Sequence, residues 1–161
     1  MKGIIKRSVS LAGAGIAGLS LILAGALSSA TNANPPAPAP IVVVPGAENY
    51  TAAPSPFPNG VMIAVLSGNP SEAGRPYTIR IKLPDGARVP VHTHGDTENV
   101  TVIQGTFLVA IGDTFDASKL KALPPGAYVS IPPNLAHYAM AKGPTIVDVS
   151  GLGPESTNFL K

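Results

Sequence analysis

Cysteine is absent from this chain of 161 residues. That absence excludes disulfide bonds, thiolate metal sites, a cysteine nucleophile and a lipidated cysteine anchor. Tryptophan is also absent, and only 5% of the residues are aromatic and 12% charged. With 17 glycines and 18 prolines, turns are frequent and long helices are not expected. The length suits one domain of ordinary size.

The basic residues are concentrated at the N-terminus. Lys2, Lys6 and Arg7 are three of the eleven Lys and Arg; without them eight basic residues face nine Asp and Glu, a net charge of −1. A nucleic-acid-binding protein needs a basic face with aromatic platforms. The remaining chain offers neither, so no nucleic-acid partner is expected.

The first 30 residues are typical of a secretory signal peptide. Their positive start is followed by an uncharged stretch at 8–30 that ends in small residues. A retained membrane anchor is the alternative, because the stretch is long enough to span a bilayer, but its glycines make it weakly hydrophobic. We therefore expect a cleaved signal at 1–30, a periplasmic or secreted protein, and no membrane association after cleavage.

Residues 31–58 are predicted to be a Pro/Ala-rich linker and N-terminal arm, since proline recurs throughout 35–40. Residues 59–161 contain short runs of β-branched residues cut by turn residues, which indicates an all-β sandwich or barrel. The predicted strands are 61–66, 77–83, 89–92, 98–103, 106–111, 128–131, 137–141 and 145–149. A tight hairpin turn is expected at Gln104 and Gly105. Alternation in 77–83 predicts that Arg80 and Lys82 face water.

The three histidines of the chain are His92, His94 and His137. His92 and His94 lie two apart in a predicted strand, so both point to one face. Glu98 follows the turn at 95–97, which can place its carboxylate beside the two imidazoles. His137 follows a Pro-Pro-Asn turn later in the chain. For the His92 and His94 pair alone, a metal ligand and a surface residue are equally good interpretations. Adding Glu98 and His137 favours a metal site of nitrogen and oxygen donors, which suits Fe, Mn, Ni, Zn or Cu.

These residues resemble the two motifs of the cupin family. The first motif reads Gly86, five residues, His92-Thr93-His94, three residues, Glu98, six residues and Gly105. The second reads Gly126, five residues, Pro132-Pro133-Asn134, two residues, His137, three residues and Ala141. Two positions of the second motif depart from the family. Asn134 replaces a turn glycine, which is mild because Asn tolerates the left-handed region, and Ala141 replaces a structural Asn.

The resemblance covers residues 77–152 and implies a single-domain cupin, a double-stranded β-helix or jelly-roll barrel at 59–161. It also implies that His92, His94, Glu98 and His137 bind a divalent transition metal at the mouth of that barrel. The family includes dioxygenases, isomerases, decarboxylases, storage proteins and sensors, so the fold does not select the reaction.

Strand alternation predicts an apolar substrate pocket around the metal. Its residues are expected to be Val100, Val102, Phe107, Val109 and Ile111, with Ile79 and Ile81 adding to the wall. Such a pocket suits dioxygenase-like chemistry on a small apolar or aromatic chelating substrate, with Glu98 as ligand and catalytic base. The alternative is a barrel that binds a metal or small ligand without turnover, for storage, sensing or structure. A small molecule is the expected partner, and a homodimer is a further expectation.

Overall fold

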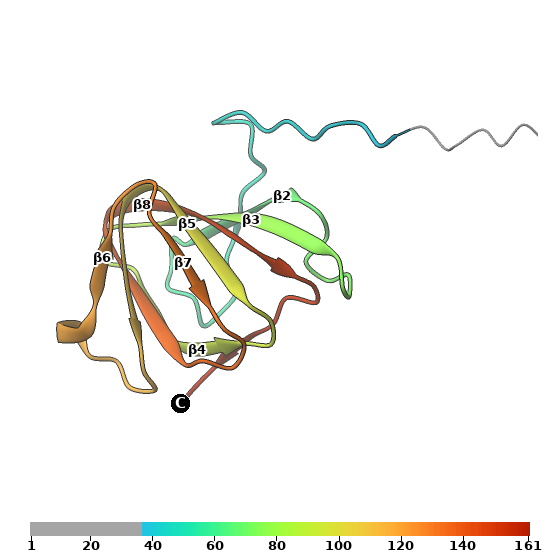
Figure 1. Cartoon of the computed structure of the whole chain (residues 1–161). Helices are drawn as coiled ribbons and strands as arrows, with labels where there is room; N and C mark the ends of the chain where they lie inside the picture. Colours follow the sequence, from blue (N-terminus) through green and yellow to red (C-terminus); the bar gives the residue numbers. More distant parts are fainter. Residues whose placement is uncertain (1–36) are drawn as a thin grey trace, which may run out of the picture. The chain divides into compact units, whose positions relative to one another are not determined.

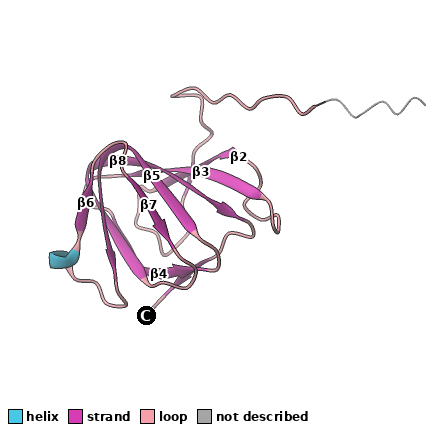
Figure 2. Ribbon diagram, viewed as in Figure 1, coloured by secondary structure: helices cyan, strands magenta, loops and turns pink. Residues whose placement is uncertain are grey.

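Strands make up almost all the regular structure of residues 37–161, the part of the chain that the computed structural model describes. The predicted signal peptide lies outside these residues. The one helical element among them is a single 3-10 turn at Ala117–Lys119 (Figure 2). The all-β prediction is therefore confirmed. The strands are β1 (Thr51–Ala52), β2 (Met62–Ser67), β3 (Pro76–Leu83), β4 (Arg88–His94), β5 (Glu98–Ile111), β6 (Lys121–Leu123), β7 (Tyr128–Ile131), β8 (His137–Leu152) and β9 (Thr157–Phe159).

The strands form one curled antiparallel sheet around a common interior (Figure 1). Its hydrogen-bonded order is β1-β2-β3-β8-β4-β9, and β5 pairs with β6, β7 and β8. Buried side chains from β3, β4, β5 and β8 fill the interior with Val, Ile, Leu and Ala. Among the described residues, no helix has the length and apolar character needed to cross a membrane.

The two longest strands correct the sequence-based strand list. Residues 98–103 and 106–111 form one strand, β5, because both halves pair with β8 instead of with each other. The expected hairpin at Gln104 and Gly105 is therefore wrong. In its place β5 carries register shifts between Val102 and Thr106. Gly105 has a φ of +76°, and a Cβ atom there would collide with the carbonyl oxygen of Pro144. Residues 137–141 and 145–149 likewise form one strand, β8.

The outer face of β3 also differs from the prediction. The Arg80 side chain is only 15% exposed instead of free in water. It donates two hydrogen bonds to Asp148 on β8, at 2.7 and 2.9 Å, and a third to Glu48 at 2.9 Å. Next to it, the Lys82 ammonium lies 3.7 Å from the centre of the Tyr50 ring. Glu48 and Tyr50 belong to the segment predicted as linker and arm, which covers this face of β3.

Candidate metal centre and cavity

Three strands position the predicted ligands. His92 and His94 lie on β4, Glu98 begins β5 and His137 begins β8. The antiparallel register of β4 and β8 sets His92 opposite His137. The turn before His137 contains Asn134, whose φ of +61° is the left-handed conformation that asparagine tolerates. Its backbone N–H donates to the His94 carbonyl at 2.9 Å, so the turn is tied to the strand that carries two ligands.

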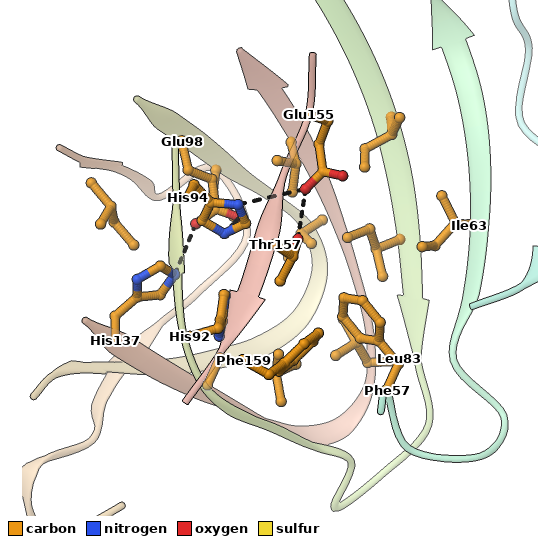
Figure 3. A pocket seen from close by; sticks show the side chains of 18 of the residues that line it. Phe57, Ile63, Leu83, His92, His94, Glu98, His137, Glu155, Thr157 and Phe159 are labelled. Carbon is orange, nitrogen blue, oxygen red and sulfur yellow. Dashed lines mark hydrogen bonds and ion pairs between the residues drawn. The ribbon is translucent and has the colours of Figure 1, made fainter. Parts of the chain in front are cut away.

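The four side chains converge in the interior (Figure 3). One donor atom from each of His92, His94, Glu98 and His137 lies within 4.8 Å of all the others. Donors on a single ion are at most roughly 4.2 Å apart, twice a metal–nitrogen distance of about 2.1 Å. Movements of less than about 1 Å would therefore close the group on one ion.

Hydrogen bonds at the far side of two rings fix which nitrogen faces the centre. His92 Nδ1 lies 2.7 Å from the Pro90 carbonyl oxygen, and His137 Nδ1 lies 2.9 Å from that of Leu135. A carbonyl only accepts, so each Nδ1–H donates and a neutral ring turns a bare Nε2 lone pair inward. This orientation is typical of histidine ligands whose outer nitrogen is held by a second group.

Two ring nitrogens of the group have no hydrogen-bond partner among residues 37–161. Nε2 of His94 and Nε2 of His137 are buried and lack a hydrogen bond. His137 Nε2 also lies 3.1 Å from a Glu98 carboxylate oxygen. An unprotonated nitrogen and a carboxylate oxygen at this distance repel, and a cation between them removes the repulsion. The residues therefore fit a divalent transition metal.

Burial and the carboxylates determine the charges of the site. Burial, with the neighbouring His137, lowers the pKa of His92 to about 4. Burial also acts to lower the pKa of His94, but Glu155 and Glu98 outweigh it and the net shift is upward. For Glu98, burial acts to raise the pKa, and the three imidazoles together hold it below the ordinary value. Glu98 is therefore ionised at neutral pH and suited to bind a cation.

A cavity of about 450 Å³ opens from this group into the barrel. Its volume is within the range of small-molecule sites. Apart from the four candidate ligands, Glu155, Ser55 and Thr157, its lining is apolar. No Lys or Arg of the described residues lines it. The cavity therefore offers apolar surface and negative charge, with no cationic side chain for an anionic substrate.

The predicted pocket residues are divided between the cavity and other places. Val100, Phe107 and Val109 line the cavity, as do Ile79 and Ile81. Val102 is buried in the core but does not line it, and Ile111 is 49% exposed on the outside. Alternation fails for Ile111 because Val109 and Ala110 are both buried, so the strand no longer alternates at its end.

Sequence reasoning missed four residues that line the cavity: Glu155, Thr157, Phe57 and Phe159. Glu155, in the loop between β8 and β9, lies 3.6 Å from His94 Nδ1 and accepts a hydrogen bond from Thr157 at 2.6 Å. Its contact with His94 lowers the pKa of Glu155, so the cavity holds a second carboxylate. Phe57 and Phe159 complete the set. The alternation of residues 157–159 was the signal for Thr157 and Phe159; no local signal marked Phe57 or Glu155.

Solved structures with this fold include proteins of different activity. The polyketide cyclase RemF from Streptomyces resistomycificus matches with a TM-score of 0.62 and 16% identity, over 74% of this chain and 84% of the cyclase. An acetylacetone dioxygenase from Acinetobacter johnsonii matches with a TM-score of 0.61 and 18% identity, over 81% and 83%. An RmlC-like cupin from Shewanella frigidimarina matches with a TM-score of 0.54 and 19% identity, over 71% and 91%.

At these identities the likeness establishes the fold. No family model and no curated protein matches the chain in sequence. Because one fold accommodates a cyclase and a dioxygenase, the reaction has to be inferred from the side chains of the site.

Proposed function

The chain has the fold of a single-domain cupin, and from that premise we propose that it is a metal-dependent dioxygenase. Its substrate would be a small, uncharged molecule that chelates the metal through two oxygens and carries an apolar or aromatic body. One observation carries the proposal: the four converging donors lie in the wall of a mostly apolar cavity. We include export in the proposal, supported by the basic start and uncharged stretch of residues 1–30.

The cavity gives a small molecule access to the four candidate ligands, which favours a catalytic metal site over a structural one. A structural site is enclosed by its protein ligands, whereas a catalytic site keeps positions open. Here the cavity reaches all four ligands, including His137, which is only 2% exposed. A ligand in the cavity would therefore meet the metal directly.

The lining limits the charge of the substrate. With Glu98 and Glu155 in the cavity and no Lys or Arg among its described lining residues, a carboxylate or phosphate would be held by the metal alone. A β-diketone, catechol or flavonol is neutral before it chelates and matches the apolar wall. The acetylacetone dioxygenase among the structural neighbours makes β-diketones the first class to test.

The roles of the residues follow from their placement. His92, His94, His137 and Glu98 would hold the metal, which when bound supplies Lewis acidity and the capacity to react with O₂. The ionised Glu98 would accept the proton that the substrate loses when it chelates as an enolate or phenolate. Val100, Phe107 and Val109 would exclude water from the reacting atoms. In the overall reaction a carbon–carbon bond of the substrate breaks and both atoms of O₂ enter the products, so no further reductant is needed.

Oxygen uptake tests the proposal. Protein prepared without O₂ and supplied with Fe(II), Mn(II) or Ni(II) should consume O₂ only when a chelator of the panel is present. His137→Ala should abolish uptake, and α-keto acids of the same size should stimulate it less than β-diketones. If no chelator stimulates uptake with any of these metals although the metal is bound, the protein is a barrel that binds without turnover.

A further inference from the structure

The cavity has a polar end and an apolar end. The three histidines and Glu98 lie together, and Phe57, Ile63 and Leu83 lie on the opposite side of the cavity (Figure 3). Ile63 and Leu83 come from β2 and β3, which carry none of the metal ligands. A molecule bound to the metal would therefore direct the rest of its body toward these side chains.

Two aromatic rings connect the ends. Phe159 on β9 is paired with His92 in the sheet, and its ring centre lies 5.5 Å from that of His92. On its other side Phe159 meets Phe57 edge to face, with ring centres 5.3 Å apart and planes at 89°. This is a favourable geometry for an aromatic pair. The Phe159 ring therefore lies between Phe57 and the metal centre, and an apolar tail that extends from the metal would reach Phe57.

The loop that carries Phe57 covers the apolar end. Pro54, Ser55, Pro56 and Phe57 all line the cavity, although the first three are exposed on their outer side. The prolines restrict this backbone, since each fixes its own φ. The Phe57 N–H donates to the Pro54 carbonyl at 3.0 Å, which closes the loop on itself.

Both ends of this loop are anchored to the barrel. Before it, Glu48 is bonded to Arg80, and the β1 strand pairs with β2. The Ala53 N–H donates to the Val61 carbonyl at 2.9 Å, and after the loop Val61 is 1% exposed in the core. Attached to the barrel on both sides, the loop forms part of the cavity wall.

We propose that Phe57, braced by Phe159, is the specificity-determining residue that sets the length of the apolar tail the cavity accepts. The substrate class is then a chelating head with an unbranched or aromatic tail that ends at the Phe57 ring. That the substrate chelates a metal rests on the proposed function. That Phe57 limits the length of an apolar tail does not.

The proposed role of Phe57 is tested with a series of β-diketones in which one alkyl arm becomes longer. The protein is loaded with Zn(II), because Zn(II) has no redox chemistry and the ligand is not turned over. Binding is measured by calorimetry. In the wild type, affinity should rise about fourfold for each buried methylene and then fall once the tail meets Phe57. Phe57→Ala should move this cut-off to longer tails and continue the fourfold gain past it. Phe57→Trp should move it to shorter tails.

Leu160→Ala is the matched control, because Leu160 follows Phe159 but is 42% exposed and does not line the cavity. Its cut-off should equal that of the wild type. Phe57→Leu keeps an apolar side chain, so it preserves the test if Phe57→Ala does not fold. An unchanged cut-off in folded Phe57→Leu and Phe57→Trp would overturn the proposal.

A second series separates the wall from the proposed function. Linear n-alkanols of increasing length, displacing N-phenyl-1-naphthylamine from metal-free protein, need no chelating head. Suppose that no diketone binds the Zn(II) protein, but that the longest alkanol accepted changes when Phe57 is replaced. This result would support Phe57 as the limit on tail length and refute a chelating substrate. Diketones that bind with a cut-off independent of Phe57 refute the wall and leave the proposed function standing.

Discussion

His137 and Glu98 face each other across 3.1 Å, although the Nδ1–H of His137 is already donated to the Leu135 carbonyl. The facing Nε2 atom therefore has a lone pair and no proton to offer the carboxylate in the neutral ring. Two acceptors this close in a buried position are stable together only when a positive charge, a proton or a metal ion, lies between them. The pair thus connects metal content and stability in one site.

Substitution of the ligands should affect metal content unequally. His92→Ala and His137→Ala each leave two imidazoles, and we expect metal content to fall from about one ion per chain to near zero. Glu98→Ala leaves the three imidazoles and should weaken binding less. Elemental analysis after dialysis measures the content, and Val102→Ala, a core change outside the cavity, is the control. Full metal content in His92→Ala would contradict the ligand assignment.

Metal-free protein should lose stability in acid because of His92. The pKa of His92 is about 4 in the folded chain and 6.5 ordinarily, so between these values the unfolded state binds a proton that the folded state does not. Lowering the pH through this window should reduce the free energy of unfolding by up to about 3 kcal/mol. His94, whose pKa is raised, acts in the opposite direction and reduces the observed change.

Urea unfolding of chelator-treated protein at several pH values measures this dependence. His92→Gln removes the titrating ring and should flatten the curve between about pH 4 and 6.5. The pKa values of Glu98 and Glu155 are lowered from the ordinary Glu value of 4.5. These two carboxylates therefore reduce the free energy of unfolding only below about pH 4.5, at the acid end of the His92 window and beyond it. The same slope in His92→Gln and wild type would show that another group is responsible.

Arg80 should be much more important for stability than an exposed arginine. Arg80→Met leaves the carboxylates of Asp148 and Glu48 close together without their counter-ion, and Glu48 is only 5% exposed. We expect a loss of about 2–4 kcal/mol. Arg75→Met is the control: its 3.6 Å pair with Glu72 has side chains 69% and 56% exposed and should be worth less than about 1 kcal/mol. Equal losses in denaturant unfolding would contradict the difference.

Gly105 and Gly143 provide a matched test of the β5 register shift. Both have positive φ, +76° and +74°. A Cβ at Gly143 meets nothing within 4 Å, so Gly143→Ala should cost only the left-handed backbone, about 1–2 kcal/mol. Gly105→Ala adds a collision with Pro144 and Thr145 and should cost about 3 kcal/mol or more. Thermal unfolding of the two variants measures the difference, which would vanish if β5 and β8 were not packed this closely.

The proposed export predicts a mature chain that begins near Thr31 or Asn34, after the small residues that follow the uncharged stretch. Mass spectrometry of the protein expressed with its full N-terminus, in a cell that exports it, measures the first residue. A chain that keeps Met1 and remains with the membrane would contradict cleavage.

Local patterns were sufficient for the fold class and for grouping three of the four candidate ligands, His92, His94 and Glu98. His92 and His94 share a face because strand side chains alternate, and a short turn brings Glu98 beside them. These relations depend on residues a few positions apart, so the sequence contains them. The left-handed Asn134 belongs to the same group, because the turn that it closes is local.

Tertiary structure alone decided the cavity and its limits. The register shifts in β5 lie between Val102 and Thr106, and irregular alternation at the end of the strand places Ile111 on the outside. Both features depend on pairing with β8, which is distant in sequence. Arg80 is covered by Glu48, an arm residue 32 positions away. Phe57 and Phe159, from the two ends of the described chain, meet because the sheet curls. A sequence fixes alternation along a strand, but contacts between distant segments depend on how the whole sheet closes.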